Sequence, residues 1–174
     1  MNGALVPGDV QELERLMAQY GDSLLRMCYA LLHDRELARD ATQESFLKAY
    51  RALGSLRSGE TEKAWLMRIA INTCKDMRRS RWWRMIDRRV TPEDLPEAGR
   101  EDDLPDEQPL LAVMNLPEKE RQVVLLHYYQ GMTLEEIAQT LDSPASTVRT
   151  RLMRARRGLR TSLKGWYYDE ESLS

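Results

Sequence analysis

Cysteine and histidine are scarce in this sequence of 174 residues, which contains two of each. Cys28 and Cys74 lie far apart in separate apolar helical patterns, so the sequence predicts two buried, reduced thiols rather than a disulfide or a pair of metal ligands. The two histidines, His33 and His127, complete no zinc-type cluster. His127 is expected to be partly buried and hydrogen-bonded rather than a ligand. We therefore expect no bound metal and no other cofactor.

Long apolar runs are also absent. No stretch reaches the roughly 20 residues that a membrane-spanning helix needs, and the first residues lack the basic-then-apolar pattern of a secretory signal. Clustered carboxylates and an activated nucleophile are missing too, which argues against an enzyme. These absences predict a soluble, cytoplasmic chain that catalyses no reaction itself.

The net charge of −2 is unusual for a nucleic-acid-binding protein, but the charge is unevenly distributed. Residues 144–165 contain seven lysines and arginines and no acid, whereas residues 91–108 contain eight acids and one arginine. The basic segment predicts local contacts with nucleic acid, made by a protein that need not bind DNA tightly alone.

The most informative stretch, residues 133–160, has the pattern of two short helices joined by a turn. The apolar residues of the first helix recur at helical spacing, as Leu134, Ile137, Ala138 and Leu141. A turn follows, in which we expect Ser143 to be the N-cap and Pro144 the first residue of the second helix. In that helix six arginines surround one apolar face, made of Val148, Leu152, Ala155 and Leu159.

An arginine-rich helix after a tight turn predicts a helix-turn-helix motif, whose second helix enters the DNA major groove. Arginine can bond guanine or phosphate through two N–H groups, and hydroxyl groups can bond bases or phosphates. Such hydroxyls lie near the start of the second helix, on Ser146, Thr147 and Thr150. The alternative is a solvated basic helix in some other helical bundle.

Three further helices are predicted in the N-terminal half, all amphipathic. The first covers residues 10–32, with a break expected near Gly21, and its inner face consists of Leu13, Leu16, Met17, Tyr20, Leu24, Met27, Cys28 and Leu31. The second covers residues 36–53 and has a narrow inner face of mostly small residues: Ala38, Ala41, Ser45, Ala49 and Leu53. The third begins at Ala64, with inward residues Leu66, Ile69, Ala70, Thr73 and Met77 and a core Trp65.

A polar ridge lies on the outer face of the second helix, where Asp40, Gln43 and Glu44 stand one turn apart and Lys48 follows. The ridge could be a docking surface. It could also be an ordinary solvated face, stabilised by an ion pair between Glu44 and Lys48. The residues alone favour the ordinary face.

The third helix carries a second polar face, which consists of Asn72, Lys75, Asp76 and Arg79. A glycine- and serine-containing loop, residues 54–63, precedes this helix and is a candidate functional loop. Near the helix end, tryptophans alternate with a basic cluster in a mixture suited to contact with nucleic-acid strands: Arg78, Arg79, Arg81, Trp82, Trp83 and Arg84. Trp82 and Trp83 fit a core or interface role equally well.

An acidic, proline-containing segment, residues 86–108, has the composition of a flexible linker. Residues 1–85 and 109–165 are the two predicted domains on either side of it, and residues 166–174 form a tail. In the second domain a helix over residues 118–129 is expected to end at Gly131. The predicted fold is therefore all-α, with two small helical domains.

Three stretches of the sequence resemble motifs of one family, the extracytoplasmic-function class of bacterial RNA polymerase sigma factors, and they occur in the same order as in that family. DATQESFLKAYRAL, from Asp40, resembles the region 2 helix that grips the clamp helices of the polymerase β′ subunit. AWLMRIAINTCKDMRR, from Ala64, resembles the helix that reads the −10 promoter element. LPEKERQVVLLHYYQGMTLEEIAQTLDSPASTVRTRLMRARRGL, from Leu116, resembles region 4, which reads the −35 element.

The resemblance implies roles for particular residues. It implies polymerase binding by Asp40, Gln43, Glu44 and Lys48, which favours the docking interpretation of the ridge. It implies that Asn72, with the loop 54–63, lines a pocket for a flipped-out non-template base, and that −10 DNA is bound by Asn72, Lys75, Asp76 and Arg79. It implies −35 DNA binding by Ser146, Thr147, Arg149, Thr150, Met153, Arg154 and Arg157.

We therefore predict a sigma factor that binds core RNA polymerase, directs it to promoters and promotes their opening. The resemblance also implies an anti-sigma partner, of a kind that is often membrane-linked. The alternative is a two-domain helix-turn-helix regulator with an N-terminal sensor half, which would need a ligand pocket or a phospho-acceptor site in that half.

Overall fold

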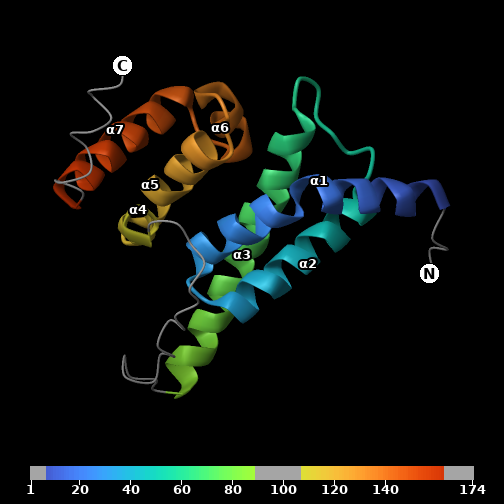
Figure 1. Cartoon of the computed structure of the whole chain (residues 1–174), viewed down its shortest axis with the longest axis horizontal. Helices are drawn as coiled ribbons and strands as arrows, with labels where there is room; N and C mark the ends of the chain where they lie inside the picture. Colours follow the sequence, from blue (N-terminus) through green and yellow to red (C-terminus); the bar gives the residue numbers. More distant parts are fainter. Residues whose placement is uncertain (1–6, 89–106, 163–174) are drawn as a thin grey trace. The chain divides into compact units, whose positions relative to one another are not determined.

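The computed structural model describes residues 7–88 and 107–162, and every element in them is helical (Figure 1). The chain divides into two compact units, residues 1–99 and 100–174. This arrangement confirms the predicted all-α fold with two helical domains.

The first unit contains α1 (Pro7–Leu32), α2 (Arg35–Arg51) and α3 (Glu62–Arg88), each of which packs against the other two (Figure 1). The turn between α1 and α2 has His33 in the left-handed region, with φ 57°. Asp34 then caps α2, because its carboxylate accepts the N–H of Leu37 at 2.9 Å. Four of the five residues predicted for the inner face of α2 are buried: Ala38, Ala41, Ser45 and Ala49. The fifth, Leu53, lies beyond the end of the helix and is half-buried.

Two predictions about α1 are wrong. The helix continues through Gly21 without a break, because a glycine inside a helix costs only about 1 kcal/mol and buried residues such as Leu16 and Leu24 hold both halves to the core. Met17, predicted on the inner face, is 50% exposed. Successive helical residues point about 100° apart, and Leu16 occupies the inward position instead.

The thiols of Cys28 and Cys74 are free and buried, as predicted. They also share a side-chain hydrogen bond, so the core brings together two residues whose sequence positions gave no sign of contact. The bond to Cys28, together with burial, raises the pKa of the Cys74 thiol. Trp65 is 2% exposed, which confirms its core position.

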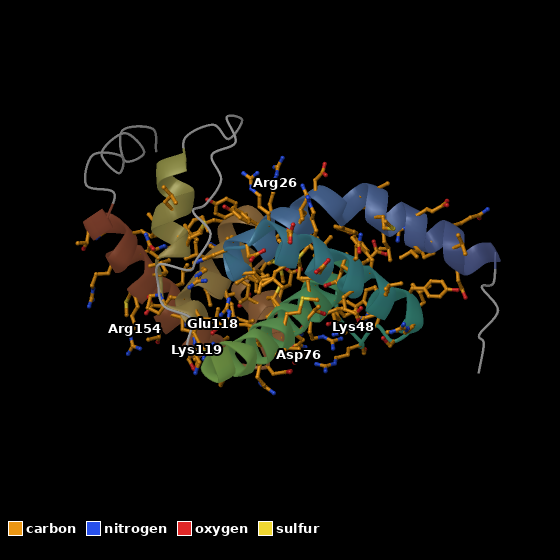
Figure 2. The ribbon with its side chains drawn as sticks, turned by 90° about the horizontal axis from the view of Figure 1, so that it is seen from below. Arg26, Lys48, Asp76, Glu118, Lys119 and Arg154 are labelled. Carbon is orange, nitrogen blue, oxygen red and sulfur yellow. The ribbon has the colours of Figure 1, made fainter. Side chains whose placement is uncertain are left out.

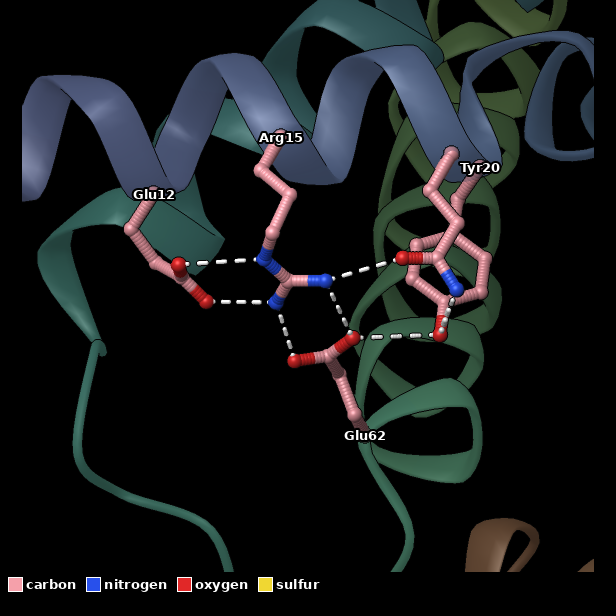
Figure 3. Close-up of polar contacts among 5 residues, drawn as sticks. Glu12, Arg15, Tyr20 and Glu62 are labelled. Carbon is pink, nitrogen blue, oxygen red and sulfur yellow. Dashed lines mark hydrogen bonds and ion pairs between the residues drawn. The ribbon is translucent and has the colours of Figure 1, made fainter.

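The start of α3 is joined to α1 by a polar network around Arg15 (Figure 3). The guanidinium of Arg15 bonds both Glu12 and Glu62, and Tyr20 donates its hydroxyl to Glu62 at 3.1 Å. Glu62 is thus the first residue of α3 and bonds α1. The loop predicted over residues 54–63 therefore ends two residues earlier than expected. The observed connection covers residues 52–61.

The second unit contains α4 (Glu107–Met114), α5 (Glu118–Val124), a short π-helix η2 (Leu125–Tyr129), α6 (Leu134–Thr140) and α7 (Ala145–Ser162). Helix α7 packs against α4, α5 and α6. Its predicted apolar face is confirmed, because Val148, Leu152, Ala155 and Leu159 are buried. The ends of the predicted linker, residues 86–88 and 107–108, lie in α3 and α4, and its remaining residues and the tail lie outside the described residues.

The single α-helix predicted over residues 118–129 is wrong in its last five residues, which form η2. The N–H of Gln130 bonds the carbonyl of Leu125, five residues back, at 3.1 Å. Gly131 then ends the helix in the left-handed region, with φ 66°, as expected. Nδ1 of His127 lies 2.9 Å from the carbonyl oxygen of Met132, which confirms a hydrogen-bonded, half-buried histidine.

A capping box begins α6, because Thr133 and Glu136 each bond the other's backbone N–H. Helix α7 begins at Ala145, one residue later than predicted. The carbonyl of Pro144 accepts the N–H groups of Thr147 and Val148, so Pro144 precedes the helix. The prediction that Ser143 is the N-cap is wrong, because its hydroxyl donates to the carbonyl of Leu141 at 3.3 Å.

Candidate nucleic-acid and polymerase interfaces

The predicted ridge of α2 lies on the surface of the first unit. Asp40 and Gln43 are exposed, and Glu44 and Lys48 are half-buried. The inner face of α2 turns the ridge outward, because the buried alanines of that face pack against α1 and α3. The ridge is therefore accessible to a partner surface, and Asp40 and Gln43 are its most exposed members.

The ammonium of Lys48 contacts residues of α3, whereas the partner predicted for it, Glu44, lies within α2. Its ammonium donates to the hydroxyl of Thr73 at 3.2 Å and lies 3.9 Å from a carboxylate oxygen of Asp76, both on α3 (Figure 2). The side chains of Lys48 and Asp76 are 37% and 66% exposed, so this ion pair is weak. Its geometric effect is to direct Lys48 toward α3 and away from the exposed end of the ridge.

Asp40 and Asp76 line the same surface pocket, of about 580 Å³, although the family resemblance implied different interfaces for them. Asp34 and Glu36 line it as well, with Leu37, Met77 and Ser80. The lining contains four carboxylates and no basic side chain, so it is better suited to a basic group than to a DNA phosphate. Asp76 thus lies at the boundary between the two predicted surfaces.

The polar face of α3 is exposed as a whole, because Asn72, Lys75, Asp76 and Arg79 are all accessible to solvent. The neighbouring Arg78 was predicted to contact nucleic acid with the basic cluster. It instead donates a hydrogen bond to the carbonyl of Leu31, at the end of α1. The side chains of residues 81–88, including Trp82 and Trp83, lie outside the described residues.

The connection before α3 contains a buried ion pair that sequence reasoning missed. The guanidinium of Arg68 donates to both carboxylate oxygens of Glu60, from Nε to Oε1 at 2.9 Å and from Nη2 to Oε2 at 3.1 Å. The side chains are only 3% exposed for Glu60 and 16% for Arg68. Burial alone raises the pKa of Glu60, but the bonds from Arg68 and from the N–H of Arg57 outweigh it and hold that pKa below its usual range.

The outer face of α7 carries the residues predicted to bind −35 DNA. Thr147 is half-buried. The other six are exposed: Ser146, Arg149, Thr150, Met153, Arg154 and Arg157. Arg154 extends outward from α7 in Figure 2. Because the opposite face of α7 is fixed in the core, these side chains project from a rigid helix, which is the geometry that a major groove admits.

Arg151 and Arg156 of α7 bond side chains of the same unit. Nε of Arg156 donates to the hydroxyl of Tyr128 at 2.7 Å, and its guanidinium lies 5.8 Å from the centre of that ring. Arg151 donates to the hydroxyl of Ser143 at 3.4 Å. Arg151 and Arg156 therefore help to hold the unit together, whereas Arg149, Arg154 and Arg157 are exposed to solvent.

Within residues 7–88 and 107–162, no group of three histidine, cysteine or acidic side chains is arranged to hold a metal ion. None of the helices described there is both long enough and apolar enough to cross a membrane.

Two family matches cover the two units separately. Residues 16–84 match the family described as Sigma-70 region 2, and residues 110–159 match the family described as Sigma-70, region 4. The first match contains the ridge of α2 and the polar face of α3, and the second contains the helix pair α6 and α7.

Curated relatives share similarity along most of the chain. The sequence is 34% identical over 171 residues to the RNA polymerase sigma-H factor of Pseudomonas aeruginosa, covering 90% of this chain and 89% of the relative. It is 27% identical to the ECF RNA polymerase sigma factor SigW of Bacillus subtilis, covering 90% and 91%. Among solved structures, the sigma factor RpoE of Bartonella quintana, in complex with the anti-sigma factor NepR, has a similar fold, with a TM-score of 0.76, 23% identity and 90% and 99% coverage.

Proposed function

Because this chain belongs to the extracytoplasmic-function class of sigma factors, we propose that its two units divide promoter recognition between them while it is bound to core RNA polymerase. One observation carries the proposal most directly. Regions 2 and 4 of the family match in order; the first match contains the ridge of α2 and the exposed polar face of α3, and the second contains the exposed basic face of α7. The family acts in transcription initiation without catalysing a reaction, and the polymerase supplies the active site.

The ridge of α2 is the proposed polymerase-binding surface, made by Asp40, Gln43, Glu44 and Lys48 against the β′ clamp helices. Its support is the exposure of Asp40 and Gln43 and the acidic pocket beside Asp40. A basic helix surface is the complementary partner for such a pocket. Most of the affinity for promoter DNA then comes from the polymerase, which is why a chain of net charge −2 can direct DNA binding.

The polar face of α3 is the proposed −10 surface. Asn72 can donate and accept hydrogen bonds through its amide, so it can read the edge of a base that has left the stack. Lys75 and Arg79 lie on the same face and can hold the sugar–phosphate backbone. Asp76 is the member of the proposed −10 surface that also lines the acidic pocket. Flipping a base costs a few kcal/mol, which pocket contacts offset.

The outer face of α7 is the proposed −35 surface, formed by Ser146, Thr147, Arg149, Thr150, Met153, Arg154 and Arg157. Arginine and hydroxyl groups can contact base edges and phosphates, and Met153, which is 56% exposed, can contact a thymine methyl group. The alternative, a ligand-sensing regulator, is not favoured because the N-terminal half matches sigma region 2 rather than a sensor domain.

A regulator of the anti-sigma type is part of the proposal. The Bartonella quintana relative was solved with the anti-sigma factor NepR, and we propose that an anti-sigma protein, of the membrane-linked kind, also binds this chain. We further propose that the chain acts in the cytoplasm, where the polymerase is.

The test is run-off transcription by a bacterial core polymerase from a promoter library, with and without the purified chain. Transcripts that depend on the chain are expected, and their complete absence would contradict the proposal. Asn72→Ala is expected to leave closed-complex formation intact and to slow opening, measured as permanganate reactivity of thymines near the start site. Arg154→Ala is the matched control, because it is expected to weaken binding of duplex −35 DNA instead, by about 1–3 kcal/mol if it reads a base.

Transcription is also compared on a duplex and on a template already mismatched at the start site. An Asn72→Ala chain that performs like the wild type on both templates would show that Asn72 has no part in opening. The −10 assignment would then fail, while the polymerase-binding and −35 assignments would be judged by the other measurements.

A further inference from the structure

The connection between α2 and α3, residues 52–61, has little regular structure but many side-chain bonds. The indole N–H of Trp65 donates to the hydroxyl of Ser55 at 3.3 Å. The N–H of Arg57 donates to Oε2 of Glu60 at 3.0 Å, and the N–H of Glu60 donates back to the carbonyl of Arg57 at 3.0 Å. Both bonds run between the same two residues, so they close a tight turn with Gly59 in it, at φ 78°.

Between these anchored ends lies an exposed tip, which consists of Leu56, Arg57 and Ser58. Leu56 is 44% exposed, whereas Glu60 is buried. Buried charges are rare unless they are paired. The connection therefore combines an accessible tip with an acid that is taken out of water to fix the shape of the turn behind it.

Arg68 links this turn to the proposed −10 surface. It stands four residues before Asn72 in α3, so the two side chains leave the same face of the helix one turn apart. The bidentate bond to Glu60 therefore attaches the turn next to the position from which Asn72 projects. The same carboxylate that receives Arg68 also holds the N–H of Arg57 in the tip.

We propose that Glu60 and Arg68 are positioning residues, which hold the tip of the α2–α3 connection in the conformation that admits an unstacked base beside Asn72. This inference rests on the proposed function. A loop that is already ordered loses little conformational entropy when it captures a ligand, whereas a mobile loop must be ordered during capture. The Glu60–Arg68 pair thus prepares the site and touches no DNA itself.

The first test measures loop order in the free, full-length chain by hydrogen exchange. Arg68→Ala removes a charge-assisted bidentate bond and leaves Glu60 unpaired, so exchange of the amides in residues 54–61 is expected to rise roughly tenfold or more. Glu60→Gln keeps an oxygen that can accept the N–H of Arg57 and is expected to give a smaller rise. Slow-exchanging amides of α2 and α3 report whether each variant is folded.

Arg15→Ala is the matched control. It also removes an arginine that bonds a glutamate near the start of α3, but that glutamate is Glu62, and the network faces α1 rather than the loop tip (Figure 3). Exchange in residues 54–61 is expected to stay at the wild-type rate in this variant. Unchanged exchange in both Arg68→Ala and Glu60→Gln would overturn the proposal.

The second test measures open-complex formation on duplex promoter DNA, with core binding and closed-complex formation measured separately. Arg68→Ala is expected to slow opening roughly tenfold while the other two steps match Arg15→Ala. Equal opening rates for Arg68→Ala, Arg15→Ala and the wild type would overturn the positioning role. A parallel loss of core binding would also overturn it, because it would indicate a general structural role. Failure of the wild-type chain to initiate at all would overturn the proposed function and the role in opening with it.

Discussion

The two units hold their proposed DNA-contacting residues by different means. In the second unit an apolar face fixes α7, with Val148, Leu152 and Ala155 buried in the core, and the DNA-facing side chains project from the opposite face. In the first unit the loop before α3 is fixed by polar bonds, above all by the buried pair of Glu60 and Arg68. A regular helix suits a regular duplex groove, whereas capture of an unstacked base needs an irregular pocket, which only specific polar bonds can shape.

The largest effect is expected from breaking the apolar face of α7. Leu152 is 3% exposed, so Leu152→Ala should lower the free energy of unfolding of the second unit by about 2–5 kcal/mol. The first unit has its own core and should keep its stability. Urea unfolding followed by hydrogen exchange of each unit measures the two separately.

Met153→Ala is the matched control, because Met153 is the next residue and is 56% exposed. Its effect on unfolding should stay within about 0.5 kcal/mol. Equal losses from Leu152→Ala and Met153→Ala would show that the apolar face does not fix α7.

A smaller, pH-dependent effect is expected from Glu60→Gln. The native pKa of Glu60 lies below its usual range, and the usual value is roughly 4.3. The stability from the charged form is therefore fully present above that value and is lost as pH falls through the lower native pKa. At neutral pH the wild type should exceed Glu60→Gln in stability by about 1.5–3 kcal/mol, the range for hydrogen bonds to charged groups.

This difference should close in acid, while the difference between the wild type and Leu152→Ala should not change with pH, because no titrating group is removed there. Denaturant unfolding at about pH 7, well above the usual pKa, and at about pH 3, below it, makes the comparison. A gap for Glu60→Gln that is the same at both pH values would mean that the charge of Glu60 does not stabilise the loop.

The apolar parts of the structure were predictable from the sequence, and the polar bonds between elements were not. Helical periodicity correctly identified the buried faces of α2 and α7, because burial repeats every three or four residues. Periodicity cannot distinguish an α-helix from a π-helix over five residues, so η2 was missed. The capping box of Thr133 and Glu136 was readable as a threonine followed three residues later by a glutamate.

The candidate surfaces were partly predictable for the same reason. The outward faces of α3 and α7 follow from their inward faces, so the exposure of Asn72 and Arg154 could be expected. The bonds that modify these surfaces join different elements: Glu60 to Arg68, Lys48 to Thr73, and Arg156 to Tyr128. Sequence spacing predicts contacts within one helix, but it does not tell which element a long side chain will reach.

The smallest effect is expected from Lys48→Met, which tests whether polymerase binding in the first unit uses charges that also hold helices together. The ammonium of Lys48 bonds Thr73 and lies 3.9 Å from Asp76. Since both charged side chains are more than a third exposed, the variant should lose less than about 1 kcal/mol of unfolding free energy. Methionine keeps most of the apolar stem, so packing of α2 on α3 should be preserved.

Core polymerase affinity should fall less for Lys48→Met than for Gln43→Ala combined with Glu44→Lys, because Lys48 is directed toward α3 whereas Gln43 is exposed. A pull-down with core polymerase measures both, with far-ultraviolet circular dichroism to verify helical content. An equal or larger loss for Lys48→Met would place its ammonium in direct contact with the polymerase and would show that the bond to α3 is exchanged on binding.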